Sequence, residues 1–141
     1  DDYNFKIGKA IKLRKGTDIT IIATGSMVFH SLQASEILES KGISCEVINM
    51  HTLKPIDVSA VKKSLKNKKL VVTVEEHTIV GGLGSAVSEL KAETGDFTPQ
   101  LSIGLPDKFG KTAEYNHLLK IHKLTGSSIA QTINKKIKKL R

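Results

Sequence analysis

Cysteine and long apolar runs are both scarce in this sequence of 141 residues. Its one cysteine, Cys45, excludes an intramolecular disulfide framework and fits a reducing compartment, so we expect a cytoplasmic protein. No apolar run approaches the roughly 18 residues that a membrane-spanning helix requires. The N-terminal stretch DDYNFKIGKA does not have the pattern of a secretory signal peptide. We therefore expect no membrane partner.

Aromatic residues are also few, which bears on the excess of positive charge. The formal net charge is +8, and many of the lysines stand in two clusters, at residues 62–69 and 135–141. Clustered cations are what phosphate contacts require. However, the chain has four phenylalanines, two tyrosines and no tryptophan, and none is interleaved with the lysines as a base-stacking surface requires. We favour solvated helix faces over a nucleic-acid partner.

Apolar β-rich runs alternate with amphipathic stretches along the chain. The expected strands occupy residues 10–15, 18–25, 44–50, 69–76 and 101–106. The expected helices occupy residues 26–41, 58–65 and 83–94, a short stretch around 118–119 and a terminal stretch from 125. This alternation predicts an α/β fold in which a mostly parallel sheet has helices on both faces. Since no repeat or internal linker interrupts the pattern, we expect residues 1–141 to form a single three-layer domain.

Four residues stand where helix ends are expected. Ser26, Asp57 and Thr125 each precede a helical stretch, and their side-chain oxygens suit N-cap positions. Gly42 follows the first expected helix, where the chain favours a residue that readily takes positive φ.

The segment EEHTIVGGLGS, Glu75–Ser85, joins an expected strand to an expected helix through a glycine-rich turn. A P-loop needs Lys and Ser or Thr after its last glycine, but Gly84 is followed by Ser85 and Ala86. The dinucleotide fingerprint GxGxxG must follow the first strand of its unit, whereas this turn follows a late strand and has Val87 in the last glycine position. Both nucleotide motifs are therefore excluded. Weak anion binding at the helix N-terminus stays open, beside a structural role as a tight turn, which we favour.

Two acids and a histidine precede that turn. Side chains alternate along a strand, so Glu75 and His77 are expected on one face and Glu76 on the other. Two ligands on one strand are too few for a zinc site. A carboxylate at the carboxyl end of a parallel strand lies where α/β sheets place ligands, but it suits equally well the capping of N–H groups in the glycine turn. We favour a structural or interface role over a catalytic one. Ser26 lacks the G-x-S-x-G setting of a nucleophile.

Four segments in order along the chain carry a family resemblance. They are DITIIATGSMV, GISCEVINMHTLKPID, VVTVEEHTIVGGLGSAVSE and IGLPDKFG, at residues 18–28, 42–57, 71–89 and 103–110. Together they resemble the C-terminal domain of transketolase-like thiamine diphosphate enzymes, and the likeness runs from Tyr3 through the terminal helix. The GKA start, the EEH and the PDKFG look most like the C-terminal section of a transketolase, including its two-chain forms.

Two other members of the same group remain as alternatives. Deoxyxylulose phosphate synthases have a similar GLPDxF, usually followed by a His-Gly pair, where this chain has Lys111-Thr112-Ala113. The beta subunits of 2-oxo-acid dehydrogenases usually have a proline-rich PDVPxPY segment, where this chain has PDKFG at residues 106–110. In such complexes the related domain acts as a partner-docking module.

The resemblance implies a three-layer α/β/α sandwich with five strands, the first antiparallel at the edge. It also implies a parent enzyme that transfers a two-carbon ketol unit between ketose and aldose phosphates. Thiamine diphosphate and Mg²⁺ would bind to pyrophosphate-binding and pyrimidine-binding domains outside this chain, with residues 1–8 as the linker from the latter. The chain is then expected to bind no cofactor or metal and to be non-catalytic alone. Its role would be domain packing and assembly of a homodimer.

The residues expected at the interface gather around the glycine turn. We define the candidate edge as Gly25, Ser26, Glu75, Glu76, His77, Gly81, Gly82, Gly84 and Ser85. This edge is expected to face a neighbouring domain or a small anion. The second possibility would make the chain a regulatory anion-binding domain.

Overall fold

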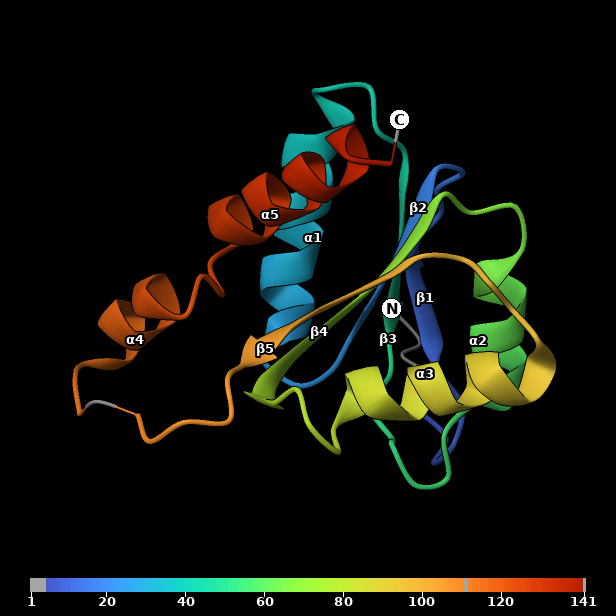
Figure 1. Ribbon diagram of the computed structural model, residues 1–141, viewed down its shortest axis with the longest axis horizontal. Coiled ribbons are helices and arrows are strands. Elements are labelled where there is room, and N and C mark those ends of the chain that lie inside the picture. Colours follow the sequence, from blue (N-terminus) through green and yellow to red (C-terminus); the bar gives the residue numbers. More distant parts are fainter. Residues whose placement is uncertain (1–4, 111, 141) are drawn as a thin grey trace.

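A five-stranded sheet forms the centre of the computed structural model, which describes residues 5–110 and 112–140 (Figure 1). The strands are β1 (Ile11–Arg14), β2 (Ile19–Ala23), β3 (Cys45–Asn49), β4 (Leu70–Thr78) and β5 (Gln100–Leu105). Their order in the sheet is β1-β3-β2-β4-β5. The edge strand β1 pairs with β3 in the antiparallel sense, and the other three pairings are parallel. The mostly parallel sheet with an antiparallel N-terminal edge strand is therefore confirmed.

Helices cover both faces of the sheet, as predicted. The helices are α1 (Met27–Glu39), α2 (Val58–Leu65), α3 (Leu83–Thr94), α4 (Tyr115–Ile121) and α5 (Gly126–Lys138). Figure 1 shows α1 and α5 on one face and α2 and α3 on the other, while α4 projects beyond the end of β5. Within the described residues, no helix is both long and apolar enough to cross a membrane.

Two apolar clusters explain why β2 has no polar face. Ile19, Ile21 and Ala23 are fully buried in the cluster that contains residues of α1 and α5. Ile22, one residue out of phase, is buried with residues of α2 and α3. A central parallel strand covered by helices on both faces is expected to be continuously apolar. The remaining β2 residue on the second face, Thr20, is also fully buried and requires hydrogen-bond partners there.

The predicted helix ends are mostly confirmed. The Asp57 carboxylate accepts a hydrogen bond from the Ala60 N–H at 3.0 Å, and Thr125 Oγ1 accepts one from the Ser128 N–H at 3.3 Å. Gly42 has the positive φ expected, +73°. Ser26 occupies the N-cap position of α1, but its backbone is helical and its side chain makes no capping hydrogen bond. The capping role predicted for Ser26 is therefore wrong, because its hydroxyl is used elsewhere.

The predicted linker lies at the N-terminal end of the chain. Residues 1–4 of the linker predicted at 1–8 lie outside the described residues. In the part that is described, Lys6 forms an isolated antiparallel bridge with Lys9, and the Phe5 ring lies 4.3 Å from the His51 ring between centroids. The linker role and the single domain stay predictions.

Replacing Asp57 should test the N-cap of α2. Burial alone would raise the pKa of the Asp57 carboxyl, but the N–H groups of Ala60 and Ala10 and the charge of Lys9 outweigh it and hold the pKa below 3.8. A lowered pKa in the folded state means that the carboxylate stabilises the fold above about pH 4, and that this contribution is lost as pH falls through the folded pKa. We expect Asp57→Ala to lower the free energy of unfolding by about 1–2 kcal/mol at pH 7.

Urea denaturation at pH 7 and at pH 3 measures this effect. The difference between the parent chain and Asp57→Ala should shrink at the lower pH, because the carboxyl begins to protonate. Glu93→Ala, on the exposed side of α3, removes a charge without removing a cap and should stay within about 0.5 kcal/mol. Equal stability of the Asp57 variant and the parent at pH 7 would contradict the role of this cap.

Candidate functional site

The candidate edge lies at the carboxyl ends of two neighbouring strands. Gly25 and Ser26 follow β2, and Glu75, Glu76 and His77 lie near the end of β4, which pairs with β2. From β2 the chain passes to α1 on one face of the sheet, and from β4 it passes to α3 on the other (Figure 1). Such a change of side between adjacent strands is the position where open α/β sheets bind ligands. The structure nevertheless divides the candidate edge into a buried part and an exposed part.

Glu75 forms the buried part together with the first turn of α3. Its side chain is 1% exposed. Oε2 accepts a hydrogen bond from the Leu83 N–H at 2.7 Å, and Oε1 accepts one from the Gly84 N–H at 2.9 Å. The N-cap residue of this helix, Gly82, has no side chain that can cap it. A carboxylate from the strand thus satisfies two free N–H groups of the helix and complements its dipole.

The glycines of this corner make room for that carboxylate. A Cβ atom on Gly82 would lie 2.0 Å from Glu75 Oε2. A Cβ atom on Gly84 would lie 2.7 Å from Ser102 Oγ on β5. These two glycines are therefore required by close packing of helix against sheet. Gly81, in contrast, has open space around it but a φ of +77°, which favours glycine for conformational reasons.

The pyrophosphate of thiamine diphosphate does not fit this glycine turn. The N–H groups of Leu83 and Gly84 already donate to the Glu75 carboxylate. An incoming phosphate would meet that negative charge at short range, in a corner with no space for a Cβ atom at Gly82. The anion-binding alternative for this turn loses its main support for the same reason. Among residues 5–110 and 112–140, no group of three or more His, Cys, Asp or Glu side chains is placed to hold a metal ion.

Glu76 forms the exposed part and points to partners from two other segments. Its Oε2 atom accepts hydrogen bonds from Ser26 Oγ at 2.5 Å and from the Tyr115 hydroxyl at 2.9 Å. Ser26 precedes α1, and Tyr115 is the first residue of α4. The carboxylate therefore ties α4 to the strand ends. Tyr115 was not predicted from the sequence, since no local pattern signals a contact with a residue 39 positions earlier.

His77 and Ser85 make hydrogen bonds to residues close to them in the sequence. His77 Nδ1 lies 2.9 Å from the carbonyl oxygen of Thr78. Ser85 Oγ accepts from the Gly81 N–H at 2.9 Å and donates to the Ile79 carbonyl at 3.2 Å, which closes the turn. The β4–β5 register shifts between residues 74 and 78, so strict alternation does not extend to His77. The prediction that Glu75 and His77 share one face of the strand required that alternation, so the register shift removes its basis.

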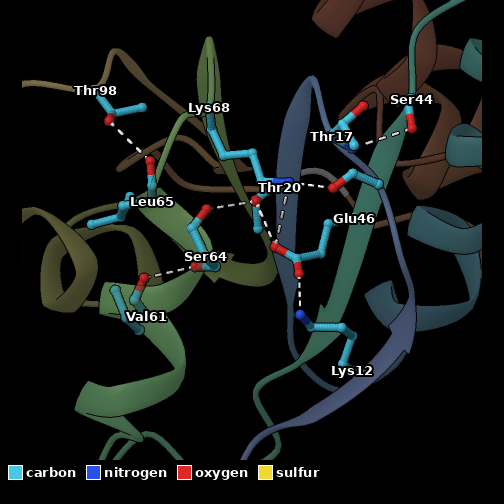
Figure 2. Close-up of polar contacts among 11 residues, drawn as sticks. Lys12, Thr17, Thr20, Ser44, Glu46, Val61, Ser64, Leu65, Lys68 and Thr98 are labelled. Carbon is cyan, nitrogen blue, oxygen red and sulfur yellow. Dashed lines mark hydrogen bonds and ion pairs between the residues drawn. The ribbon is translucent and has the colours of Figure 1, made fainter.

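A second polar cluster lies far from the candidate edge and was missed by sequence reasoning. Glu46 on β3 is 4% exposed, and its Oε2 atom lies 2.9 Å from Thr20 Oγ1 on β2 (Figure 2). Its Oε1 atom lies 2.5 Å from Lys12 Nζ on β1. Lys68 Nζ is 3.9 Å from Glu46 Oε2 and donates to the Gly16 carbonyl. The available signal was the one charged residue, a glutamate, in the largely apolar strand of residues 44–50.

Comparison with protein families gives one match over most of the chain. The model of the family described as "Transketolase, C-terminal domain" matches residues 8–129. A protein of Methanocaldococcus jannaschii described as "Putative transketolase C-terminal section" is 48% identical over 139 residues, which cover 99% of this chain and 43% of that protein. The 1-deoxy-D-xylulose-5-phosphate synthase of Caldanaerobacter subterraneus subsp. tengcongensis is 38% identical over 138 residues, covering 98% of this chain and 22% of that enzyme. The chain thus spans less than half the length of these relatives.

Among solved structures, one similar chain is that of a "Split gene transketolase, inactive beta4 tetramer". It superposes with a TM-score of 0.89 at 36% sequence identity. The superposition covers 99% of this chain and 46% of that chain.

Proposed function

The chain belongs to the family of transketolase C-terminal domains, and from this premise we propose that it is the C-terminal part of a transketolase-type enzyme. In the proposed reaction, the whole enzyme transfers a two-carbon ketol unit from a ketose phosphate to an aldose phosphate. The likeness to a "Putative transketolase C-terminal section" over 99% of the chain is the observation that carries this choice. We place the assembly in the cytoplasm, in the pentose phosphate pathway.

The cofactor of the proposed enzyme binds outside this chain. Thiamine diphosphate and Mg²⁺ would supply the carbanion chemistry from the pyrophosphate-binding and pyrimidine-binding domains. In support, the N–H groups of the glycine turn, where the sequence left weak anion binding open, already donate to the Glu75 carboxylate. The chain alone is therefore proposed to be catalytically silent.

The proposed role of the candidate edge is to pack against a neighbouring domain. Its exposed residues Glu76 and His77 are followed along the chain by two apolar side chains outside the defined set, Ile79 at 38% and Val80 at 63% exposed. Apolar groups beside fixed polar groups are typical of a contact surface. Behind them, the Glu75 corner holds the strand end and α3 in a fixed relation. Such a rigid support suits a domain that positions others, since preorganised geometry decides catalytic rate.

The remaining domains are proposed to reside in the same chain or in a separate partner chain. The split-gene transketolase structure is described as an inactive tetramer of beta chains, which agrees with a C-terminal chain that needs another chain for activity. The complete enzyme is proposed to be a homodimer of the assembled unit.

An activity assay of the separate and combined parts tests the proposed function. The 141-residue chain should show no ketol transfer from a ketose phosphate to an aldose phosphate with thiamine diphosphate and Mg²⁺ present. Combination with the pyrophosphate-binding and pyrimidine-binding parts should produce the transfer. Turnover by the chain alone would refute the proposal, as would a complete enzyme with no ketol transfer.

Replacing Glu76 or His77 in the assembled enzyme should disturb assembly more than chemistry. Glu76→Ala removes the acceptor of two hydroxyl groups, and hydrogen bonds of this kind contribute about 0.5–1.5 kcal/mol each. Because these two hydrogen bonds hold the proposed contact surface in place, we expect the association constant of the assembled enzyme to fall about fivefold to tenfold. Sedimentation velocity measures assembly, and kcat per assembled enzyme should stay within about twofold of the parent.

Glu93→Ala is the matched control for that pair of measurements. It removes an exposed carboxylate from α3 at a distance in sequence from the candidate edge and should leave assembly unchanged. An intact dimer with a collapsed turnover rate in the Glu76 or His77 variant would contradict the packing role.

A second candidate function is a deoxyxylulose phosphate synthase, favoured by the 38% identity to such an enzyme over 98% of the chain. Formation of 1-deoxy-D-xylulose 5-phosphate by the complete enzyme distinguishes it from ketol transfer. The candidate edge would have the same packing role in either enzyme.

A further inference from the structure

A groove lies between the edge strand β1 and helix α2, apart from the candidate edge. It encloses about 410 Å³. Three lysines, Lys9, Lys12 and Lys63, line it together with small residues of α2, among them Ser59 and Ala60. A volume of this size lies within the range of about 300–1,000 Å³ that is usual for small-molecule sites.

One of the three lysines is held in position by a buried carboxylate. Lys12 Nζ lies 2.5 Å from Glu46 Oε1, and the Glu46 side chain is 6% exposed. Thr20 Oγ1 lies 2.9 Å from the other oxygen of Glu46 and 2.8 Å from the Ser64 carbonyl of α2, so its one hydroxyl proton faces two acceptors (Figure 2). Figure 2 shows Lys12 reaching Glu46 from β1 while Lys68 approaches from the opposite side. The ammonium group of Lys12, which lines the groove, is therefore held in position by Glu46.

The acid that lines the groove, Asp57, and the acid behind it, Glu46, are both engaged inside the fold. Asp57 accepts hydrogen bonds from the Ala60 N–H through Oδ1 and from the Ala10 N–H through Oδ2, each at 3.0 Å. Glu46 is paired with Lys12 and Lys68.

The lysines exceed the acids in number. Within the described residues, neither Lys9 nor Lys63 has a carboxylate oxygen within the 4.0 Å of an ion pair. Lys9, Lys12 and Lys63 against Asp57 leave a formal net charge of +2 among the lining residues, and the pair Glu46 and Lys68 behind them adds none. A dianion is the charge that complements this excess.

We propose that this groove binds the phosphoryl group of a small phosphorylated compound. A phosphate dianion matches the net charge, and its oxygens accept hydrogen bonds from lysine ammonium groups. Ile48 and Ala10 also line the groove and provide an apolar wall for the carbon part of such a compound. The same phosphoryl chemistry is offered by inorganic phosphate and by a sugar phosphate.

Titration of the ¹⁵N-labelled 141-residue chain with inorganic phosphate and, separately, with ribose 5-phosphate tests the proposal. At constant ionic strength, we expect saturable shifts of the amides of Ala10, Ala60 and Lys63, and no comparable shifts at Gly82–Ser85. Equal affinity for both probes assigns the groove to the phosphoryl group alone, and tighter binding of ribose 5-phosphate assigns it to a phosphorylated sugar. The absence of saturable shifts with either probe overturns the proposal, as does a response centred on Gly82–Ser85.

Two lysines in the same turn of α2 give a matched pair of variants. Lys63→Gln removes a charge that lines the groove, whereas Lys62→Gln removes an equal charge from the adjacent position, outside the lining. Both lysines are exposed, and glutamine has nearly the same helix propensity, so both variants should fold. We expect Lys63→Gln to weaken binding at least fivefold and Lys62→Gln by less than twofold. Equal weakening of binding by both variants would mean that the overall positive charge attracts the probe, and it would overturn the proposal of a site in the groove.

These measurements use neither the complete enzyme nor its activity. Failure of the groove to bind would therefore leave the proposed function untouched, and loss of ketol transfer would leave the groove untouched.

Discussion

Gly82→Ala should lower the free energy of unfolding by about 3–5 kcal/mol, as much as any single change at the candidate edge. The added Cβ atom would lie 2.0 Å from Glu75 Oε2 and 2.8 Å from the Thr78 carbonyl oxygen. Overpacking of this kind typically costs about 1–3 kcal/mol. Displacing the Glu75 carboxylate also weakens two hydrogen bonds to a charged group, each worth about 1.5–3 kcal/mol. The backbone of Gly82, with φ of −94°, does not itself demand glycine, so the effect is steric.

Urea denaturation and thermal melting measure this change, with Gly110→Ala as the control. Nothing lies within 4 Å of a Cβ atom placed on Gly110, and its φ is not positive, so this variant should be as stable as the parent. The melting temperature of Gly82→Ala should fall by about 10 °C or more. If the two variants unfolded alike, the packing around Gly82 and Glu75 would be loose enough to accommodate a methyl group, which would contradict this prediction.

The regular elements were predictable because their signals are local. The glycine turn predicted a helix over residues 83–94, and α3 runs over Leu83–Thr94. Parallel strands place their carboxyl ends at one edge, so Ser26 and Glu76 were rightly expected near each other although 50 residues separate them. Apolar periodicity and the order of strands and helices therefore predicted the mostly parallel sheet with helices on both faces, whereas the antiparallel sense of β1 was implied by the family resemblance.

The specific partners of the side chains were not predictable in this way. Serine is a residue type that is favoured at N-caps, but the Ser26 hydroxyl donates instead to the Glu76 carboxylate on strand β4. Tyr115 and Lys12 reach acids that lie 39 and 34 residues away, on other strands. Such contacts depend on which faces of the elements meet, and local periodicity says nothing about that pairing.

Glu75→Ala should be nearly as damaging as Gly82→Ala, but for an electrostatic reason. The change leaves the N–H groups of Leu83 and Gly84 without their acceptor in a buried corner. A buried donor without a partner costs about 1–3 kcal/mol, so we expect a loss of about 3–5 kcal/mol in total. Glu75→Gln keeps one acceptor oxygen but turns an amide N–H₂ toward a backbone N–H, so a loss of about 2–3 kcal/mol is expected. Hydrogen exchange of the Leu83 and Gly84 amides should accelerate tenfold or more in both variants.

Glu76→Gln is the control for charge, because it neutralises the adjacent carboxylate, which is exposed. It should change stability by less than about 1 kcal/mol and leave the exchange of Leu83 and Gly84 unaltered. In a variant that combines Glu75→Ala with Gly82→Ala, the atom nearest to the new methyl group, Glu75 Oε2, is gone. The double variant should therefore lose less stability than the two single losses added together. Strict additivity, or equal acceleration of exchange in the Glu76 variant, would mean that Glu75 does not hold the start of α3.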